Sequence, residues 1–194
     1  MKLNNENAVI FFPDGKEDLG RTTHIAISAH HDDIELMAMH GVLECFGKKD
    51  KWFTGVVVTD GAGSPRNGLY ADYTDEEMKA VRVVEQKKAA VVGEYAAQLM
   101  LGYTSAAVKD GGNDKVVEDL MRVIEETRPE VVYTHNPADK HDTHCAVVLR
   151  VIEAIRRLPK ELRPKKLYGC EVWRDLDWVV DEEKTVFDVS AHPN

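Results

Sequence analysis

Apolar residues gather in short blocks along the chain, and polar clusters follow several of these blocks directly. Residues 24–29, His-Ile-Ala-Ile-Ser-Ala, form a short apolar run of the kind that a buried strand needs. Four polar residues follow, and then apolar residues at helical spacing predict a helix that ends near Gly47. Residues 53–59 are rich in β-branched side chains and predict a second strand, with a turn at Asp60 and Gly61.

The same alternation continues through the second half of the chain. Residues 61–73 are rich in Gly, Ser, Pro and Asn and predict a long loop. Thr74 and Glu77 have the form of a capping box, so a helix should begin there and end near Gly93. Further helices are expected at 114–126 and 146–158, and further strands at 131–134, 167–172 and 185–189. Strands that alternate with helices indicate an α/β fold, a mostly parallel sheet flanked by helices in a single domain.

Composition and charge narrow the class of protein. The 194 residues are 43% hydrophobic and 30% charged, as in an ordinary globular protein, which excludes disordered and collagen-like chains. A protein with a net charge of −9 lacks the excess of basic residues that is typical of a nucleic-acid binder. No apolar stretch reaches the length of a membrane span. The three cysteines have no C-x-x-C spacing and predict buried thiols in a reducing compartment, so a cytoplasmic protein is expected.

Candidate chemistry lies at the ends of two predicted strands. Residues 30–35 read His-His-Asp-Asp-Ile-Glu, and residues 135–144 read His-Asn-Pro-Ala-Asp-Lys-His-Asp-Thr-His. Five of the eight histidines fall in these two stretches. The carboxyl ends of neighbouring parallel strands gather functional loops at one edge of a sheet. Imidazole together with carboxylate suits Zn²⁺, and two histidines with one carboxylate form a catalytic pattern that leaves a position for water.

These residues resemble the PIG-L (LmbE-like) family of zinc-dependent N-deacetylases. Residues 29–33, Ala-His-His-Asp-Asp, are similar to the family signature A-H-P-D-D, and residues 141–144, His-Asp-Thr-His, resemble its second motif, H-P-D-H. Further features follow in the family's order: Thr59-Asp60-Gly61, Arg82 with Glu85, and Gly93. The resemblance covers about residues 24–155 and implies a Rossmann-like sheet with zinc at the carboxyl ends of its strands.

The resemblance also implies roles for individual residues. His30, Asp33 and His144 would bind one zinc ion per chain, and Fe²⁺ or another divalent ion suits the same donors. Asp32 would act as the general base on a zinc-activated water, and His141 would assist the departing amine. The implied reaction removes an N-acetyl group from an N-acetylglucosamine-type conjugate or oligosaccharide.

Side chains near these motifs are candidates for holding the substrate. Arg82 matches an arginine that the family uses for this purpose, while Arg66 and Asn136 offer hydrogen bonds to a sugar. Trp173 and Trp178 have the size to form an aromatic wall, but the core is the expected place for both. The expected partner is therefore a small acetylated amino-sugar. A homo-oligomer is compatible with the sequence, whereas nucleic acid and a membrane span are not expected.

The sequence departs from the family pattern at several positions. His31 replaces proline and Asp142-Thr143 replaces Pro-Asp, so the partner of His141 stays open between Asp142 and Asp139. The chain of residues 1–194 also ends before the further helix that relatives usually carry, either as a piece of a longer protein or as a short one. A non-catalytic relative that binds metal and sugar, and an amidase on another small N-acyl amine, therefore stay open as alternatives. A nucleotide-binding module is disfavoured, because the sequence has no glycine-rich phosphate motif.

Overall fold

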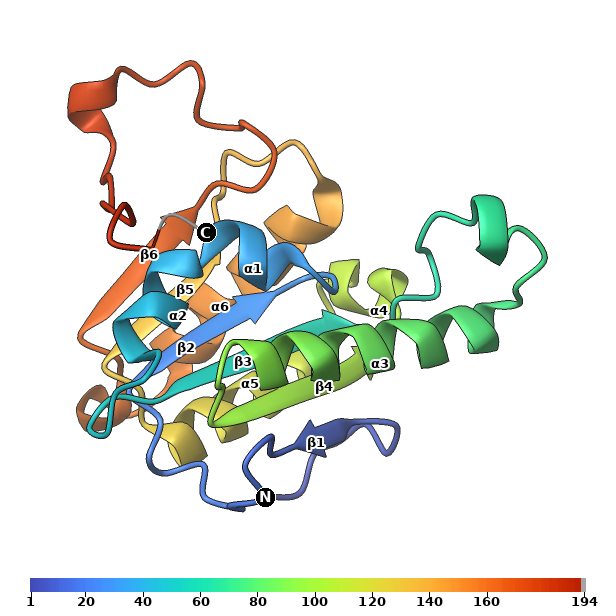
Figure 1. The fold of residues 1–194 in the computed structure, drawn as a ribbon, viewed down its shortest axis with the longest axis horizontal. Helices are drawn as coiled ribbons and strands as arrows, with labels where there is room; N and C mark the ends of the chain where they lie inside the picture. Colours follow the sequence, from blue (N-terminus) through green and yellow to red (C-terminus); the bar gives the residue numbers. More distant parts are fainter. Residues whose placement is uncertain (193–194) are drawn as a thin grey trace.

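A six-stranded sheet forms the centre of the protein in the computed structural model, which describes residues 1–192 (Figure 1). The strand order is β1-β4-β3-β2-β5-β6. The strands are β1 Val9–Phe11, β2 His24–Ser28, β3 Phe53–Thr59, β4 Ala97–Tyr103, β5 Val131–His135 and β6 Lys166–Cys170. β1 runs antiparallel to β4, and the other neighbouring pairs are parallel. The predicted α/β fold with a mostly parallel sheet is confirmed.

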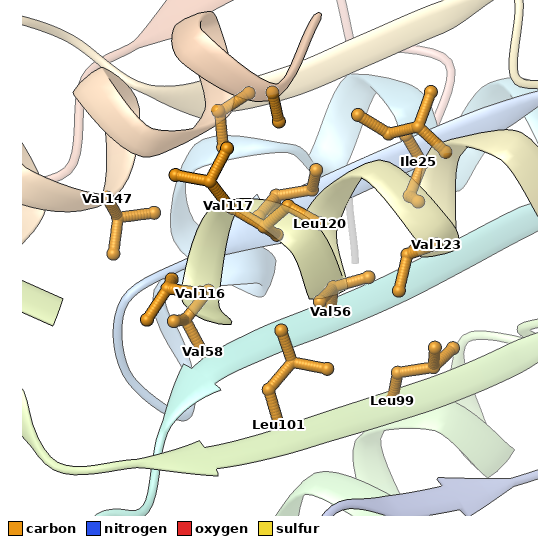
Figure 2. Packing of buried hydrophobic residues seen from close by; sticks show 14 of the residues in the cluster. Ile25, Val56, Val58, Leu99, Leu101, Val116, Val117, Leu120, Val123 and Val147 are labelled. Carbon is orange, nitrogen blue, oxygen red and sulfur yellow. The ribbon is translucent and has the colours of Figure 1, made fainter. Parts of the chain in front are cut away.

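Helices cover both faces of the sheet. They are α1 Asp33–Met37, α2 Met39–Cys45, α3 Asp75–Val92, α4 Ser105–Lys109, α5 Asp114–Thr127 and α6 Asp142–Arg157, with 3₁₀ turns η1 Gly68–Tyr70, η2 Lys160–Leu162 and η3 Asp181–Glu183. Successive strand residues point to opposite faces. Val56 of β3 therefore joins the core beneath α5 and α6, whereas Val57 joins the core beneath α1, α2 and α3. Figure 2 shows the first core, with Leu120 of α5 facing the apolar side chains of β3 and β4.

The strand order creates a crevice at one edge of the sheet. From β2 the chain passes to β3 and β4 on one side, and it later places β5 and β6 on the other side of β2. The loops that follow β2 and β5 leave in opposite directions and separate beyond the carboxyl ends of these two strands, which is where open α/β sheets bind ligands. β2 ends at Ser28 and β5 ends at His135, so both polar clusters begin at this crevice.

The predicted strands agree with the structure in four places and fail in one. β2, β3, β5 and β6 are found with ends within two residues of the prediction. The strand predicted at 185–189 is wrong, because that segment is irregular. Phe187 stacks on His40 of α2 with ring centroids 3.8 Å apart, while Val186 is 77% exposed. The segment thus contributes one aromatic ring to the core rather than a strand to the sheet.

Several other elements differ from the sequence prediction. β1 and β4 are not predicted at all. The single helix expected to end near Gly47 is divided at Ala38 into α1 and α2. α3 is confirmed together with its capping box, in which the side chains and backbone amides of Thr74 and Glu77 bond reciprocally. α6 begins at Asp142 rather than at 146, which places the second motif on its first turn. Within residues 1–192 no helix is both long and apolar enough to cross a membrane.

Candidate metal centre and active site

Three side chains from the segments that follow β2 and β5 meet at the crevice between these two strands. His30 follows β2, Asp33 opens α1, and His144 lies in the first turn of α6. Nδ1 of His30 lies 3.1 Å from Nε2 of His144, and Oδ2 of Asp33 lies 3.3 and 3.4 Å from these two nitrogens. Asp33 and His144 are buried, whereas His30 is partly exposed. Two imidazoles and one carboxylate thus converge on a single point beside the solvent.

The spacing of these atoms fits a divalent metal ion. Tetrahedral ligands about 2.0–2.1 Å from Zn²⁺ lie roughly 3.3 Å from one another. The ring of His144 is also oriented for this purpose, because its Nδ1 bonds Oδ2 of Asp139 at 2.8 Å and its Nε2 faces Nδ1 of His30 and Oδ2 of Asp33. A carboxylate in this position commonly fixes the tautomer of a metal-binding histidine. The donor set therefore suits a metal both in chemistry and in geometry.

A further histidine, His135 at the end of β5, touches the same carboxylate but is engaged elsewhere. Its Nε2 lies 3.4 Å from Oδ2 of Asp33 and accepts a hydrogen bond from the backbone amide of Ala29 at 2.8 Å. Its ring is fully buried and stacks on His144 with centroids 4.0 Å apart. Because the backbone amide of Ala29 occupies the lone pair of Nε2, this nitrogen is not available to a metal ion. His135 therefore packs against the donors without being one of them. Sequence reasoning gave it no role, and the available signal was its place as the last residue of a buried strand.

Opposing effects set the protonation of the donors. Burial raises the pKa of Asp33, but the neighbouring rings of His135 and His30 outweigh it and hold that pKa well below its usual range. Burial, aided by the neighbouring His135, lowers the pKa of His144. An ionised carboxylate and a neutral imidazole are the states that metal binding requires.

Asp32 has an unusual backbone and is anchored by α3. Its φ of 75° lies in the left-handed region. Its backbone amide donates to Oε1 of Gln86 at 3.2 Å, and its Oδ2 accepts from Nη2 of Arg82 at 2.8 Å. Arg82 also bonds the carbonyl oxygen of His31 at 2.8 Å and pairs with Glu85. α3 thus fixes the direction of an Asp32 side chain that remains 65% exposed.

His141 is the N-cap of α6 and lies beside the donors. Its ring centroid is 4.9 Å from that of His30 and 4.5 Å from that of His144. Its Nδ1 accepts the backbone N–H of Thr143 at 3.3 Å, whereas the nearest oxygen of Asp142 is 3.8 Å away. Asp139 bonds the backbone amide of His141 instead of its ring. The ring partner that the sequence left open is therefore a backbone N–H, and a neutral ring in this arrangement carries its proton on Nε2.

A cavity of about 680 Å³ opens onto these groups. Six of the predicted site residues line it, namely His30, Asp32, Asp33, Arg82, His141 and His144. The structure does not bring Arg66 and Asn136 to this cavity. Arg66 pairs with Asp75, and the side-chain amide of Asn136 donates to the carbonyl of Gly169 at 3.1 Å. Their contact with a substrate stays a prediction.

The two tryptophans are not in the core. Trp173 lines the cavity and is 59% exposed, and Trp178 is 72% exposed, so the expectation that both are buried is wrong. Both follow β6, where the chain has left the sheet. A buried Asp175, which accepts the backbone amide of Trp173 at 3.2 Å, holds this segment in place. The position of Trp173 beside the cavity agrees with the alternative interpretation, in which this residue forms part of an aromatic wall.

Known proteins are similar to this chain in sequence and in fold. The sequence model of the PIG-L family, described as GlcNAc-PI de-N-acetylase, matches residues 25–155. A protein from Bacillus cereus, named probable N-acetyl-alpha-D-glucosaminyl L-malate deacetylase 2, is 24% identical over 168 residues, which cover 86% of this chain and 76% of that protein.

Two solved structures illustrate the fold. N,N'-diacetylchitobiose deacetylase from Pyrococcus horikoshii matches with a TM-score of 0.59 at 18% identity, over 89% of this chain and 62% of that one. The 4-carboxy-2-hydroxymuconate hydratase from Pseudomonas putida matches with a TM-score of 0.54 at 18% identity, over 76% of this chain and 62% of that one. This chain thus spans about three fifths of the length of either structure, and at this identity the likeness shows the fold alone.

The matched segment contains the donors, Asp32, Arg82 and His141, and it makes up more than half of the chain. The family match and the geometry of the two motifs concern the same residues. The chain therefore belongs to the PIG-L family.

Proposed function

We propose that this protein is a metal-dependent N-deacetylase of N-acetylglucosamine-type sugars. The observation that carries the proposal is the convergence of His30, Asp33 and His144, whose donor atoms lie 3.1–3.4 Å from one another at the floor of the cavity. These three residues would hold Zn²⁺ or a similar divalent ion. Such an ion supplies a Lewis acid for the amide carbonyl and a nucleophilic water at neutral pH.

Asp32 would take the proton of the attacking water. It lies next to Asp33 in sequence, but its side chain is exposed and contacts Arg82 rather than the donors. Two carboxylates in one turn thus separate into a buried ligand and an accessible base. Hydrolysis adds the water oxygen to the acetyl carbon, and the C–N bond breaks as the amine nitrogen receives a proton.

His141 would provide the proton donor on the other side of the reacting amide. With Nδ1 engaged by the N–H of Thr143, the ring can present an N–H at Nε2 toward the developing oxyanion or the leaving amine. Its side chain is 46% exposed, so the donor is accessible from the cavity.

The substrate class follows from the relatives. The Bacillus protein is named for an N-acetylglucosaminyl conjugate and the Pyrococcus enzyme for an N-acetylated disaccharide, and both names give deacetylation. The hydratase shows that the fold also serves another reaction, so the sugar substrate is inferred from the family match rather than from the fold. The three free thiols agree with a reducing compartment, and we place the protein in the cytoplasm.

The test is acetate release from acetylated amino-sugars by wild type and Asp32→Asn. Asparagine tolerates a left-handed backbone, so the turn should persist. We expect metal content to remain at the wild-type level while turnover falls by about 10²- to 10⁴-fold, because the proton acceptor is lost.

Asp50→Asn serves as the control. It removes the same charge from an exposed loop at the amino end of β3, away from the cavity, and it should leave turnover unchanged. Wild-type turnover in Asp32→Asn would remove Asp32 from the mechanism. If the wild-type protein retains metal but releases acetate from none of the N-acetylated sugars, the result would favour the non-catalytic alternative.

A further inference from the structure

Glu35 is the third acidic residue of the polar cluster at residues 30–35, and it has no role in the hydrolysis described above. It lies in α1, three residues after Asp32, which is the N-cap of that helix. Together with Asp32 and Gln86 it lines a pocket of about 290 Å³, and this pocket shares Asp32 and Arg82 with the wall of the larger cavity. Glu35 therefore lies directly behind the proposed base.

Two buried donors hold one oxygen of Glu35. Its Oε1 accepts the hydroxyl of Tyr95 at 2.8 Å and Nε2 of Gln86 at 3.1 Å. Tyr95 and Gln86 are each only 2% exposed. The ring of Tyr95 also packs against Phe53 of β3, with centroids 4.7 Å apart. Because a ring in a close-packed core has little room to move, Tyr95 fixes the position of this oxygen relative to the sheet.

The bond from Glu35 determines which way the side-chain amide of Gln86 faces. Nε2 of Gln86 donates to Oε1 of Glu35 and also to Oε1 of Gln98, at 3.3 Å. Gln98 presents its oxygen there because its own Nε2 donates to the carbonyl of Leu99. With both acceptors on one side, Gln86 turns its nitrogen toward them. Its oxygen therefore faces the backbone N–H of Asp32, which it accepts at 3.2 Å.

This orientation matters because the backbone of Asp32 is strained. Its φ of 75° persists only where the surroundings support it. If the amide of Gln86 were turned over, its NH₂ group would face the N–H of Asp32, and two donors cannot bond each other. A turn that relaxes would move the carboxylate of Asp32. A misplacement of about 1 Å in an active site can cost about 10²-fold in rate.

We propose that Glu35 is a positioning residue for the general base, acting through Gln86 on the backbone of Asp32. The inference rests on the proposed deacetylase function and explains how its base is held. Arg82 holds the carboxylate end of Asp32, whereas Glu35 and Gln86 hold its backbone end. What Glu35 contributes is a fixed acceptor for Gln86.

The first experiment compares Glu35→Met with Glu35→Gln in the metal-loaded protein. Methionine has a similar length without an acceptor, whereas glutamine keeps an oxygen for Tyr95 and Gln86. We expect Glu35→Met to lower kcat by about 10- to 10²-fold, with KM within about twofold and metal content unchanged. Glu35→Gln should stay within about threefold of wild type. Wild-type kcat in Glu35→Met, or an equal loss in both variants, would overturn the inference and leave the deacetylase function intact.

A double variant tests whether Glu35 acts through Asp32. Once Asp32→Asn has removed the base, adding Glu35→Met should lower the residual turnover by less than about twofold, because the two effects are coupled. A further loss as large as in the wild-type background would mean that Glu35 acts independently of Asp32, and would refute the inference.

Asp119→Asn is the control for stability. Asp119 of α5 is a buried carboxylate beneath the other face of the sheet, where it bonds the hydroxyl of Tyr103 and the backbone amide of Asn4. The substitution should lower Tm but leave kcat within about twofold. A loss of kcat as large as in Glu35→Met would show that lower stability alone reduces turnover, and would count against a positioning role.

Amide hydrogen exchange in the metal-free protein provides a readout that needs no substrate. The N–H of Asp32 should exchange slowly in wild type, Glu35→Gln and Asp119→Asn, and at least about tenfold faster in Glu35→Met, because the local turn opens more often. Unchanged exchange in Glu35→Met would overturn the inference. If no N-acetylated sugar releases acetate, the proposed function fails, and the exchange result still decides whether Glu35 supports the turn.

Discussion

At position 32 the backbone adopts a left-handed conformation, and its side chain is the one to which we assign proton transfer. Such a conformation costs of order 1 kcal/mol or more for a residue with a Cβ and persists only where the surroundings hold it. Gln86 and Arg82 of α3 supply that hold through the backbone amide and the carboxylate of Asp32. The geometry of the base thus depends on a helix that contributes none of the proposed metal donors.

The ion pair between Asp14 and Arg21 leads to a pH-dependent prediction. Arg21 bonds both carboxylate oxygens of Asp14, at 2.7 and 2.8 Å, and this lowers the pKa of Asp14 from 3.8 to about 2. A carboxyl whose pKa is lowered by folding stabilises the fold above its unfolded pKa and loses that effect as pH falls through the folded one.

Asp14→Asn should therefore lower the free energy of unfolding near neutral pH, and the difference from wild type should shrink as pH falls from about 4 toward 2. Because the pair lies at the surface, with the side chain of Asp14 34% exposed, the loss should be only about 0.2–1 kcal/mol. Urea denaturation of both proteins between about pH 2 and pH 7 measures the difference. A gap that is constant across this range would exclude the ion pair as its cause.

Several residues of the site were readable from the sequence because their chemistry is compressed into short motifs. The polar clusters after two buried strands predicted a shared site, and the resemblance to the family motifs implied His30, Asp33 and His144 as its ligands. Arg66 and Asn136 were chosen by residue type alone, and in the structure both are engaged by nearby groups within 1–192. Local contacts of this kind depend on loop conformation, which neither periodicity nor spacing encodes.

At the scale of elements, α2 packs on the sheet through a glycine. A Cβ on Gly41 would lie 2.5 Å from the ring of Tyr133 and 3.1 Å from that of Phe53. Both rings are buried, and the hydroxyl of Tyr133 bonds Nδ1 of His40 at 2.9 Å. Neither ring can move aside freely, so α2 approaches the sheet more closely than any residue with a side chain would permit.

Gly41→Ala should consequently destabilise the protein by about 1–3 kcal/mol through overpacking, even though alanine favours a helix. Thermal or urea denaturation gives the value. Gly111→Ala is the matched control, since a Cβ there meets nothing within 4 Å, and it should remain within about 0.5 kcal/mol of wild type. A stabilised Gly41→Ala variant would mean that α2 can shift away from Tyr133.

Elements with strong local patterns were predictable, whereas those defined by their neighbours were not. β3 is almost entirely β-branched and was found at its predicted bounds. β4 contains Ala, Gln, Leu and Met, residues with high helix propensity, and it is a strand because it pairs with β3 on one side and β1 on the other. Long-range pairing of this kind leaves little trace in a single segment.

For the whole molecule, the proposed metal joins parts of the chain that are far apart in sequence. The connection between His30 and His144 spans 114 residues. A ligand that binds only the folded state stabilises it by mass action, about 2.7 kcal/mol at a hundredfold excess over Kd. For a protein of this size each kcal/mol raises Tm by roughly 2–4 °C.

We therefore expect Zn²⁺ to raise the Tm of the metal-free wild type by roughly 5–10 °C in a thermal denaturation experiment. His30→Ala should lose most of this rise because it removes one donor. His192→Ala, at a residue that lines a different groove beside α2 and α3, should retain it. An undiminished rise in His30→Ala would reject the donor assignment.

During biosynthesis the three proposed donors are not made together, because α6 follows β2, β3 and β4 along the chain. A nascent chain leaves the ribosome from its N-terminus, so β2, β3 and β4 with the loop that carries His30 and Asp33 emerge long before α6. Two of the three donors would therefore be present without the third until His144 has been translated and α6 has packed on the sheet. Maturation of the centre is expected to be one of the last steps of folding, after most of the sheet already exists.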